Sequence, residues 1–152
     1  MVFVNKSMAT KLALINQSAV LLSPALLALL QPGFVEVDGC FFLKTLALAE
    51  TNVSTQNFPD KTGYECFINS IHIDDYVQGD FLDYSILFAE KAFEIWRSSG
   101  CPGEILAIVT CDEFGASVKI HQKRSGESWL GSNLEAYEDA VLLADSATIK
   151  LR

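Results

Sequence analysis

Residues 104–123, Glu104-Ile-Leu-Ala-Ile-Val-Thr-Cys-Asp-Glu-Phe-Gly-Ala-Ser-Val-Lys-Ile-His-Gln-Lys123, contain two strand patterns separated by a short turn. The first pattern, Glu104–Asp112, is an almost continuous apolar run, which is typical of a central strand covered on both faces. The second, Ala116–Lys123, alternates apolar residues with Lys119 and His121, so we expect a strand with one face in water. The three residues between them predict a tight turn and therefore an antiparallel pair.

The most regular helical pattern lies upstream, from Phe81 to Ser98. Apolar residues from Leu82 to Trp96 recur at spacings of four and three, which places them on one face of a helix. Gly100 is a natural stop, because glycine readily adopts the left-handed conformation that ends many helices. Together with the strands, this helix predicts an α+β fold, with helices packed on one face of a mostly antiparallel sheet.

The remaining elements are read from shorter patterns. Alternation over Phe34–Asp38 predicts a strand, and Asp38-Gly39 is a hairpin dipeptide. The expected later elements are a return strand over Cys40–Leu46, or alternatively a helix over Leu43–Glu50, a loop over Thr51–Gly63, a strand over Tyr64–Tyr76, a loop over Ser125–Ser132, a helical turn over Asn133–Tyr137, and a last strand or continued helix over Ala140–Ala144.

The N-terminal region, Leu12–Leu30, is apolar enough to suggest a membrane span or a secretory signal. Polar residues interrupt this run at 16–18, and Ser23-Pro24 interrupts it again. Two core helices explain the pattern better, one over Ser7–Leu22 and one over Pro24–Gln31, with Ser23 as the N-cap of the second. We therefore expect an N-terminal helical hairpin and no membrane partner.

The length and the charge of the chain limit the functions that it could have. The chain has 152 residues, which fits a single domain over residues 1–152, and its formal net charge is −8. Binding to nucleic acid depends on lysine and arginine neutralising phosphates, so this balance argues against nucleic acid as a partner. It favours a basic protein partner, although solubility alone would also explain it.

The four cysteines, Cys40, Cys66, Cys101 and Cys111, carry no metal-ligand spacing. Each lies among apolar residues, where free cysteine behaves as a small buried hydrophobe. We expect reduced thiols in a cytoplasmic protein, with two disulfides as the alternative. No cofactor or metal is predicted.

The two histidines, His72 and His121, are both expected on the polar faces of strands. If those strands are adjacent, the histidines and Asp74 would form an acid–base or metal site. Because exposed strand histidines are common and no nucleophile motif accompanies them, we do not expect an enzyme.

Two acidic stretches that also carry aromatic residues are the strongest functional signal. Acidic side chains attract a basic partner, and tyrosines supply rigid contact area at small entropic cost. The predicted partner-binding residues are Asp74, Asp75, Tyr76, Asp80, Asp83, Tyr84, Glu135, Tyr137, Glu138 and Asp139. The alternative is that the aromatic residues belong to the core and the acids stabilise a helix N-terminus.

Three segments of the C-terminal third resemble bacterial immunity proteins of contact-dependent growth inhibition systems. These segments are Cys111-Asp-Glu-Phe-Gly-Ala-Ser-Val-Lys-Ile-His-Gln-Lys-Arg124, Gly126-Glu-Ser-Trp129 and Asn133-Leu-Glu-Ala-Tyr137. The three segments together contain 23 of the 152 residues. The resemblance implies a cytoplasmic protein, which we expect to be a monomer when free, that neutralises a cognate toxin domain, often a nuclease. The alternatives are an acidic homodimeric secretion chaperone and a small enzyme using His72 and His121.

Overall fold

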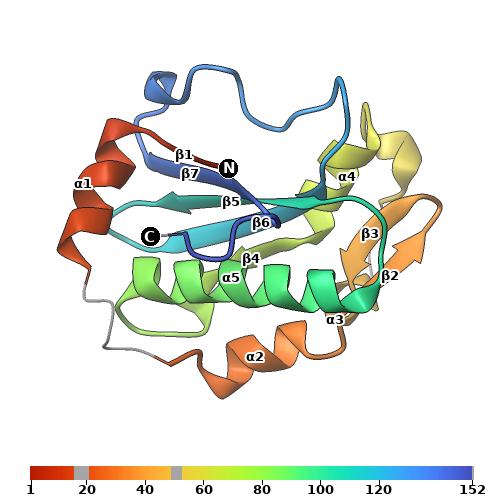
Figure 1. The fold of residues 1–152 in the computed structure, drawn as a ribbon, viewed down its shortest axis with the longest axis horizontal. Helices are drawn as coiled ribbons and strands as arrows, with labels where there is room; N and C mark the ends of the chain where they lie inside the picture. Colours follow the sequence, from red (N-terminus) through yellow and green to blue (C-terminus); the bar gives the residue numbers. More distant parts are fainter. Residues whose placement is uncertain (16–20, 49–52, 152) are drawn as a thin grey trace.

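The computed structural model describes residues 1–15, 21–48 and 53–151, which form an α+β fold around a five-stranded antiparallel sheet (Figure 1). The strand order is β1-β7-β5-β6-β4. The strands are β1 (Val2–Val4), β4 (Ser70–His72), β5 (Ile105–Cys111), β6 (Ala116–Gln122) and β7 (Ala140–Asp145). The expected central position of β5 is confirmed: it pairs with β6 on one side and β7 on the other.

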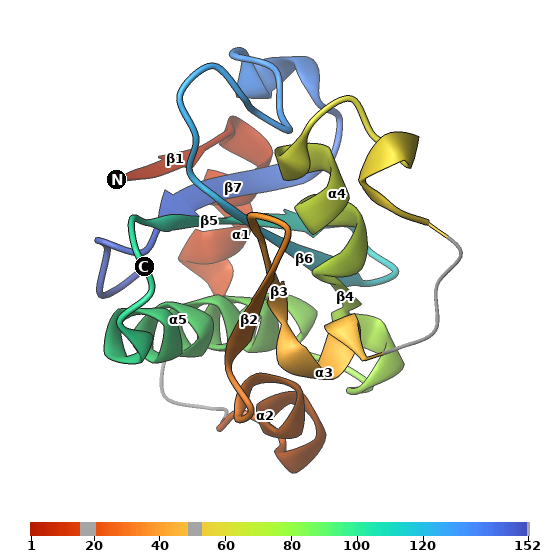
Figure 2. The same cartoon turned by 90° about the vertical axis from the view of Figure 1, so that its right-hand side faces the viewer.

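Helix α5 (Phe81–Ser99) covers one face of the sheet, as its apolar stripe predicts (Figure 2). Alternate residues of the three central strands point into this interface, including Val109, Val118 and Leu142. Trp96 closes the layer at the C-terminal end of α5, where its ring centroid lies 5.1 Å from those of Phe34 and Phe41. Helix α5 ends at Gly100, whose φ of 76° is the expected left-handed cap.

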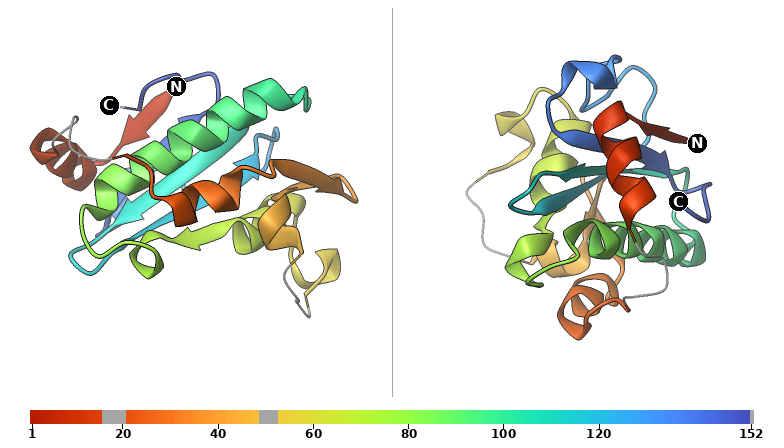
Figure 3. Two further views of the ribbon diagram at one scale, coloured as in Figure 1. Left: turned by 90° about the horizontal axis from the view of Figure 1, so that it is seen from below. Right: turned by 90° about the vertical axis from the view of Figure 1, so that its left-hand side faces the viewer.

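The N-terminal segment differs from the expected helical hairpin, which is not confirmed. It begins with β1, an edge strand on β7 that the sequence did not indicate, and α1 then spans only Lys6–Leu14 and packs against β7 (Figure 3). The second helix, α2 (Pro24–Leu30), starts where Ser23 and Pro24 predict, but packs on α5. Residues 16–20 of the expected first helix lie outside the described residues. No described helix is long and apolar enough to cross a membrane.

The hairpin of β2 (Phe34–Val37) and β3 (Cys40–Leu43) is confirmed and turns at Asp38-Gly39, where φ is 51° and 79°. A short helix, α3 (Lys44–Ala47), follows, so the return strand stops earlier than Leu46 and the helical alternative holds for part of its range. Residues 49–50 of that alternative are not described.

The expected strand over Tyr64–Tyr76 is mostly wrong. Its first half belongs to helix α4 (Lys61–Ile68), and only β4 is extended before the short η2 helix (Ile73–Asp75). The cause is a cap, since the Asp60 side chain accepts a hydrogen bond from the Gly63 N–H at 2.7 Å and starts a helix inside the expected loop. The rest of that loop holds the short η1 helix (Thr55–Asn57), and residues 51–52 are not described.

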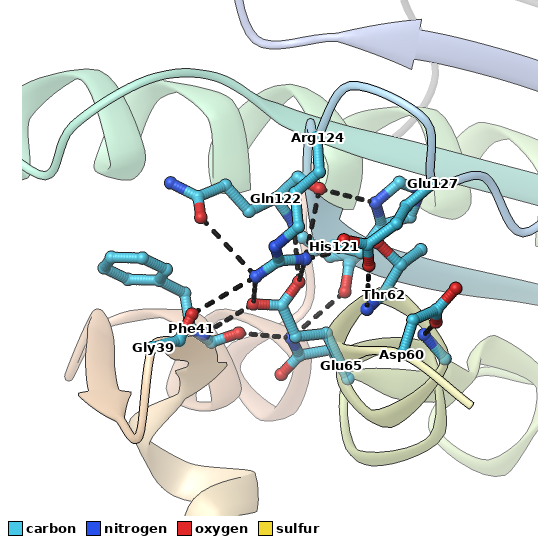
Figure 4. Close-up of polar contacts among 12 residues, drawn as sticks. Gly39, Phe41, Asp60, Thr62, Glu65, His121, Gln122, Arg124 and Glu127 are labelled. Atoms are coloured by element: carbon cyan, nitrogen blue, oxygen red, sulfur yellow. Dashed lines mark hydrogen bonds and ion pairs between the residues drawn. The ribbon is translucent and has the colours of Figure 1, made fainter. Parts of the chain in front are cut away.

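A buried ion pair joins α4, the β2–β3 hairpin and the end of β6 (Figure 4). Glu65 is 0% exposed, and its two carboxylate oxygens accept from Arg124 Nη1 and Nη2 at 2.6 and 2.7 Å. The same oxygens accept from the backbone N–H groups of Phe41 at 2.6 Å and Gln122 at 2.8 Å. Because every contact is internal, this pair holds the hairpin against the sheet and is not a site for a ligand.

Asn69 makes the second link between the hairpin and the sheet. Its side-chain amide donates to the carbonyl oxygens of Phe41 and Ile120 and accepts from the Leu43 N–H at 2.8 Å. The Asn69 side chain therefore provides hydrogen bonds that link β3 to β6, which do not pair directly.

Candidate functional site

The two acidic stretches converge at one end of the sheet, around the β5–β6 turn. Helix η2 follows β4 there, Asp139 precedes β7, and α5 begins beside Cys111. We call this surface the acidic end. Its exposed carboxylates are Asp74, Asp75, Asp80, Asp112, Glu113, Glu138 and Asp139. Grouping charges of one sign raises the local field that a basic partner meets.

The turn itself is held in a defined shape that presents Phe114. The Asp112 Oδ1 atom accepts from the N–H groups of Phe114 and Gly115 at 2.8 and 3.0 Å. Asp74 Oδ1 accepts from the Ala116 N–H at 3.2 Å, which ties η2 to the same turn. Phe114 is 79% exposed and lines the same hollow as Asp74, Asp112 and Asp139, so an apolar side chain lies beside exposed carboxylates.

Gly115 is required by this arrangement. A Cβ atom at that position would overlap the carboxylate of Asp74, so no other residue fits unless Asp74 moves. A hollow of about 260 Å³ lies beside the turn, lined by His72, Asp74 and Asp139 together with Thr110 and Ser117. One residue from each predicted acidic stretch, Asp74 and Asp139, therefore borders the same depression.

The predicted partner-binding residues do not all lie on the surface. Most are exposed, namely Asp74, Asp75, Tyr76, Asp80, Glu135, Tyr137, Glu138 and Asp139. Asp83 is only 7% exposed, and Tyr84 is half-buried against the core, so neither presents a free surface. Both face inward because α5 is covered over most of its circumference. The sequence reading missed Phe114, which it had assigned to a turn without a function.

Two of the exposed predicted residues also stabilise the fold. Glu135 Oε1 accepts from the Lys6 N–H at 2.6 Å, at the start of α1. The Tyr137 hydroxyl accepts from the Gly131 N–H at 2.8 Å. These two residues hold the loop before β7 and are not part of the acidic end.

The two histidines are not brought together, although their strands are adjacent as the hypothesis required. His72 pairs with Ser117 across β4 and β6, and His121 lies four positions further along β6 than Ser117, a distance of roughly 13 Å. The expectation that His121 faces water is wrong, because it is 1% exposed. In the part of the chain that the structure describes, no group of three or more His, Cys, Asp or Glu residues is arranged to hold a metal ion.

The four cysteines are unpaired, and all four are among the described residues. Three are buried and Cys101 is half-buried. Burial raises the pKa of the Cys66 thiol to about 12 and also raises the pKa values of Cys40 and Cys111. These three thiols therefore stay protonated at neutral pH and are poor nucleophiles.

Comparison with known proteins places the chain in a family. Residues 3–151 match the Uncharacterized protein PM0498 family. The chain belongs to that family. It is similar to uncharacterized protein PM0498 of Pasteurella multocida (strain Pm70), with 33% identity over a match that covers 84% of this chain and 87% of that protein. No solved structure matches the chain.

Proposed function

We propose that this protein is a cytoplasmic immunity protein that binds a basic toxin domain through the acidic end. The observation that supports the proposal is the placement of Phe114, 79% exposed, among carboxylates contributed by four separate segments of the chain. Exposed carboxylates speed the encounter with a basic surface, and a buried aromatic anchor slows dissociation. A toxin that cleaves nucleic acid has a basic substrate-binding surface, which an acidic protein occludes by covering it.

The binding mode follows from the shape of the acidic end. Backbone N–H groups of the β5–β6 turn donate hydrogen bonds to Asp112 and Asp74, which fixes the turn, so little conformational entropy is lost when Phe114 enters a pocket on the partner. Asp75 and Glu113 would then contact lysine or arginine side chains at the rim. This is the arrangement of a small central anchor with a polar border.

The test is a growth assay with the C-terminal domain of the protein encoded immediately upstream of this one. Cells that express that domain should grow only when this protein is co-expressed. The variant Phe114→Ala should lose most of the protection, while Leu48→Ala, which removes an equally exposed apolar side chain elsewhere, should retain it. Full protection by Phe114→Ala, or no toxic domain in the upstream gene, would count against the proposal.

One observation favours the second candidate function, an acidic homodimeric secretion chaperone. Strand β1 forms an edge of the sheet, and its Phe3 side chain is 57% exposed. An exposed edge strand can pair with the same strand of a second copy and extend the sheet. The mass in solution separates the two functions, since an immunity protein is expected as a monomer when free and the chaperone as an obligate dimer.

A further inference from the structure

The face of the sheet opposite α5 is covered by residues 123–139, a long loop with the short η3 helix (Leu134–Ala136). Figure 1 shows this loop running above the sheet, while α5 lies below it. The loop is anchored at both ends. Near its start, Glu127 Oε1 accepts from the Thr62 N–H at 3.2 Å, and near its end Asn5 Nδ2 donates to the carbonyl oxygens of Leu134 and Asp139 at 3.3 and 2.8 Å.

Between this loop and the sheet lies a pocket of about 560 Å³, a volume typical of small-molecule sites. Its floor is mainly apolar and comes from strands β5, β6 and β7, and its wall comes from the loop. The residues that define it are Leu106, Ile108 and Leu143 on the floor and Trp129, Leu130 and Leu134 in the wall. Because the loop is anchored and the floor is a rigid sheet, the pocket is already formed without an occupant.

His121 places one polar atom in this apolar floor. The residue pairs with Leu106 across the sheet, lines the pocket and is 1% exposed. Its Nδ1 atom lies 2.8 Å from the Gln122 carbonyl oxygen, which has no proton to give, so Nδ1 carries the ring proton and donates. The Nε2 atom is then an acceptor, and among the described residues it has no hydrogen-bond partner. Burial lowers the pKa of His121, which keeps the ring neutral.

We propose that the pocket binds an uncharged, mainly apolar small molecule that donates one hydrogen bond, from a hydroxyl or N–H group, to His121 Nε2. An acceptor in an apolar floor selects a ligand with a matching donor, because an unmatched polar group costs binding free energy. Anions are disfavoured by Glu135, which also lines the pocket, and an ammonium group would lose its hydration against the apolar lining. Trp129 contributes an indole ring to the lining, so an aromatic ligand fits best.

This site is separate from the acidic end and does not depend on the proposed function. The test uses two probes with the same ring system, 2-naphthol and 2-methoxynaphthalene, in which a methoxy group replaces the hydroxyl donor, with binding measured by calorimetry at neutral pH. The unmodified protein should bind 2-naphthol about tenfold more tightly, the effect of one hydrogen bond to a buried acceptor. His121→Phe keeps a ring but removes the acceptor, so it should bind both probes equally.

A second pair of variants tests the location. Leu143→Trp fills the pocket and should abolish binding of both probes, while Leu48→Trp places the same residue on an exposed position and should leave binding unchanged. Because His121→Phe could fail to fold, the nitrogen NMR signals of His121 are also followed in the unmodified protein. The Nε2 signal should move upfield with 2-naphthol and not with 2-methoxynaphthalene. Equal affinities for the two probes, no binding of either, or an unmoved Nε2 signal would overturn the proposal.

Discussion

Replacing Glu65 by Gln should be among the most destabilising conservative changes in this protein. The substitution keeps the shape but leaves the Arg124 guanidinium without its counter-charge, and it turns one carboxylate oxygen into an NH₂ group that faces a backbone N–H donor. Breaking a buried ion pair from one side costs about 3–5 kcal/mol. The matched control is Glu94→Gln, which breaks the surface pair with Lys91 and should cost about 0–1 kcal/mol.

Urea unfolding followed by tryptophan fluorescence measures both variants. The slope of the free energy against urea should be unchanged, so that the midpoint shift reports stability alone. In the Glu65→Gln background, the further change Arg124→Met should cost about 2 kcal/mol less than it does alone, because the charge it removes is already unpaired. A loss of about 1 kcal/mol or less for Glu65→Gln would refute the reasoning that this pair holds the hairpin against the sheet.

Three further outcomes are expected. Gly115→Ala should lower the unfolding midpoint clearly, because its methyl group overlaps Asp74. Gly79→Ala should leave the midpoint unchanged, because there is open space around that residue. Equal midpoints for the two variants would contradict the tight turn. A thiol reagent should modify only Cys101 rapidly in the folded protein and all four cysteines after unfolding without reductant; finding no thiols then would mean disulfides. Folding lowers the pKa of His121 below 6.5, so just below that pH the unfolded chain binds more protons than the folded protein, and stability should fall as pH drops through 6.5. The variant His121→Gln should lose less stability over this interval. Parallel pH profiles for the two proteins would contradict the burial of His121.

The elements that could be predicted are those fixed by neighbouring residues. Strands β5 and β6, helix α5 and the Asp38-Gly39 turn follow from periodicity and turn chemistry, and the structure has them close to where they were expected. Helix α4 was missed because the cap at Asp60 outweighs the apolar alternation that suggested a strand. Strand β1 was missed because its partner, β7, lies about 140 residues later, and no local pattern marks that pairing.

The candidate site, too, could be predicted only in part. Charge clustering marked most of the exposed acidic residues, but it could not show that two stretches more than 50 residues apart meet at one turn. It also placed Asp83 on the surface. The apolar pattern of α5 predicted a helix that is covered on most sides, but it did not show which side stays exposed. His121 was expected in water because its strand alternates, yet the loop over residues 123–139 covers that face.

The rate of association with the proposed toxin partner tests the central claim most directly. The triple variant Asp75→Asn, Glu113→Gln, Glu138→Gln removes three charges from the acidic end, and Glu36→Gln, Asp38→Asn, Glu94→Gln removes three exposed charges elsewhere. In stopped-flow measurements at low salt, the first variant should associate roughly tenfold more slowly than the second, and the difference should shrink as salt rises. Equal association rates for the two variants at low salt would contradict binding through the acidic end.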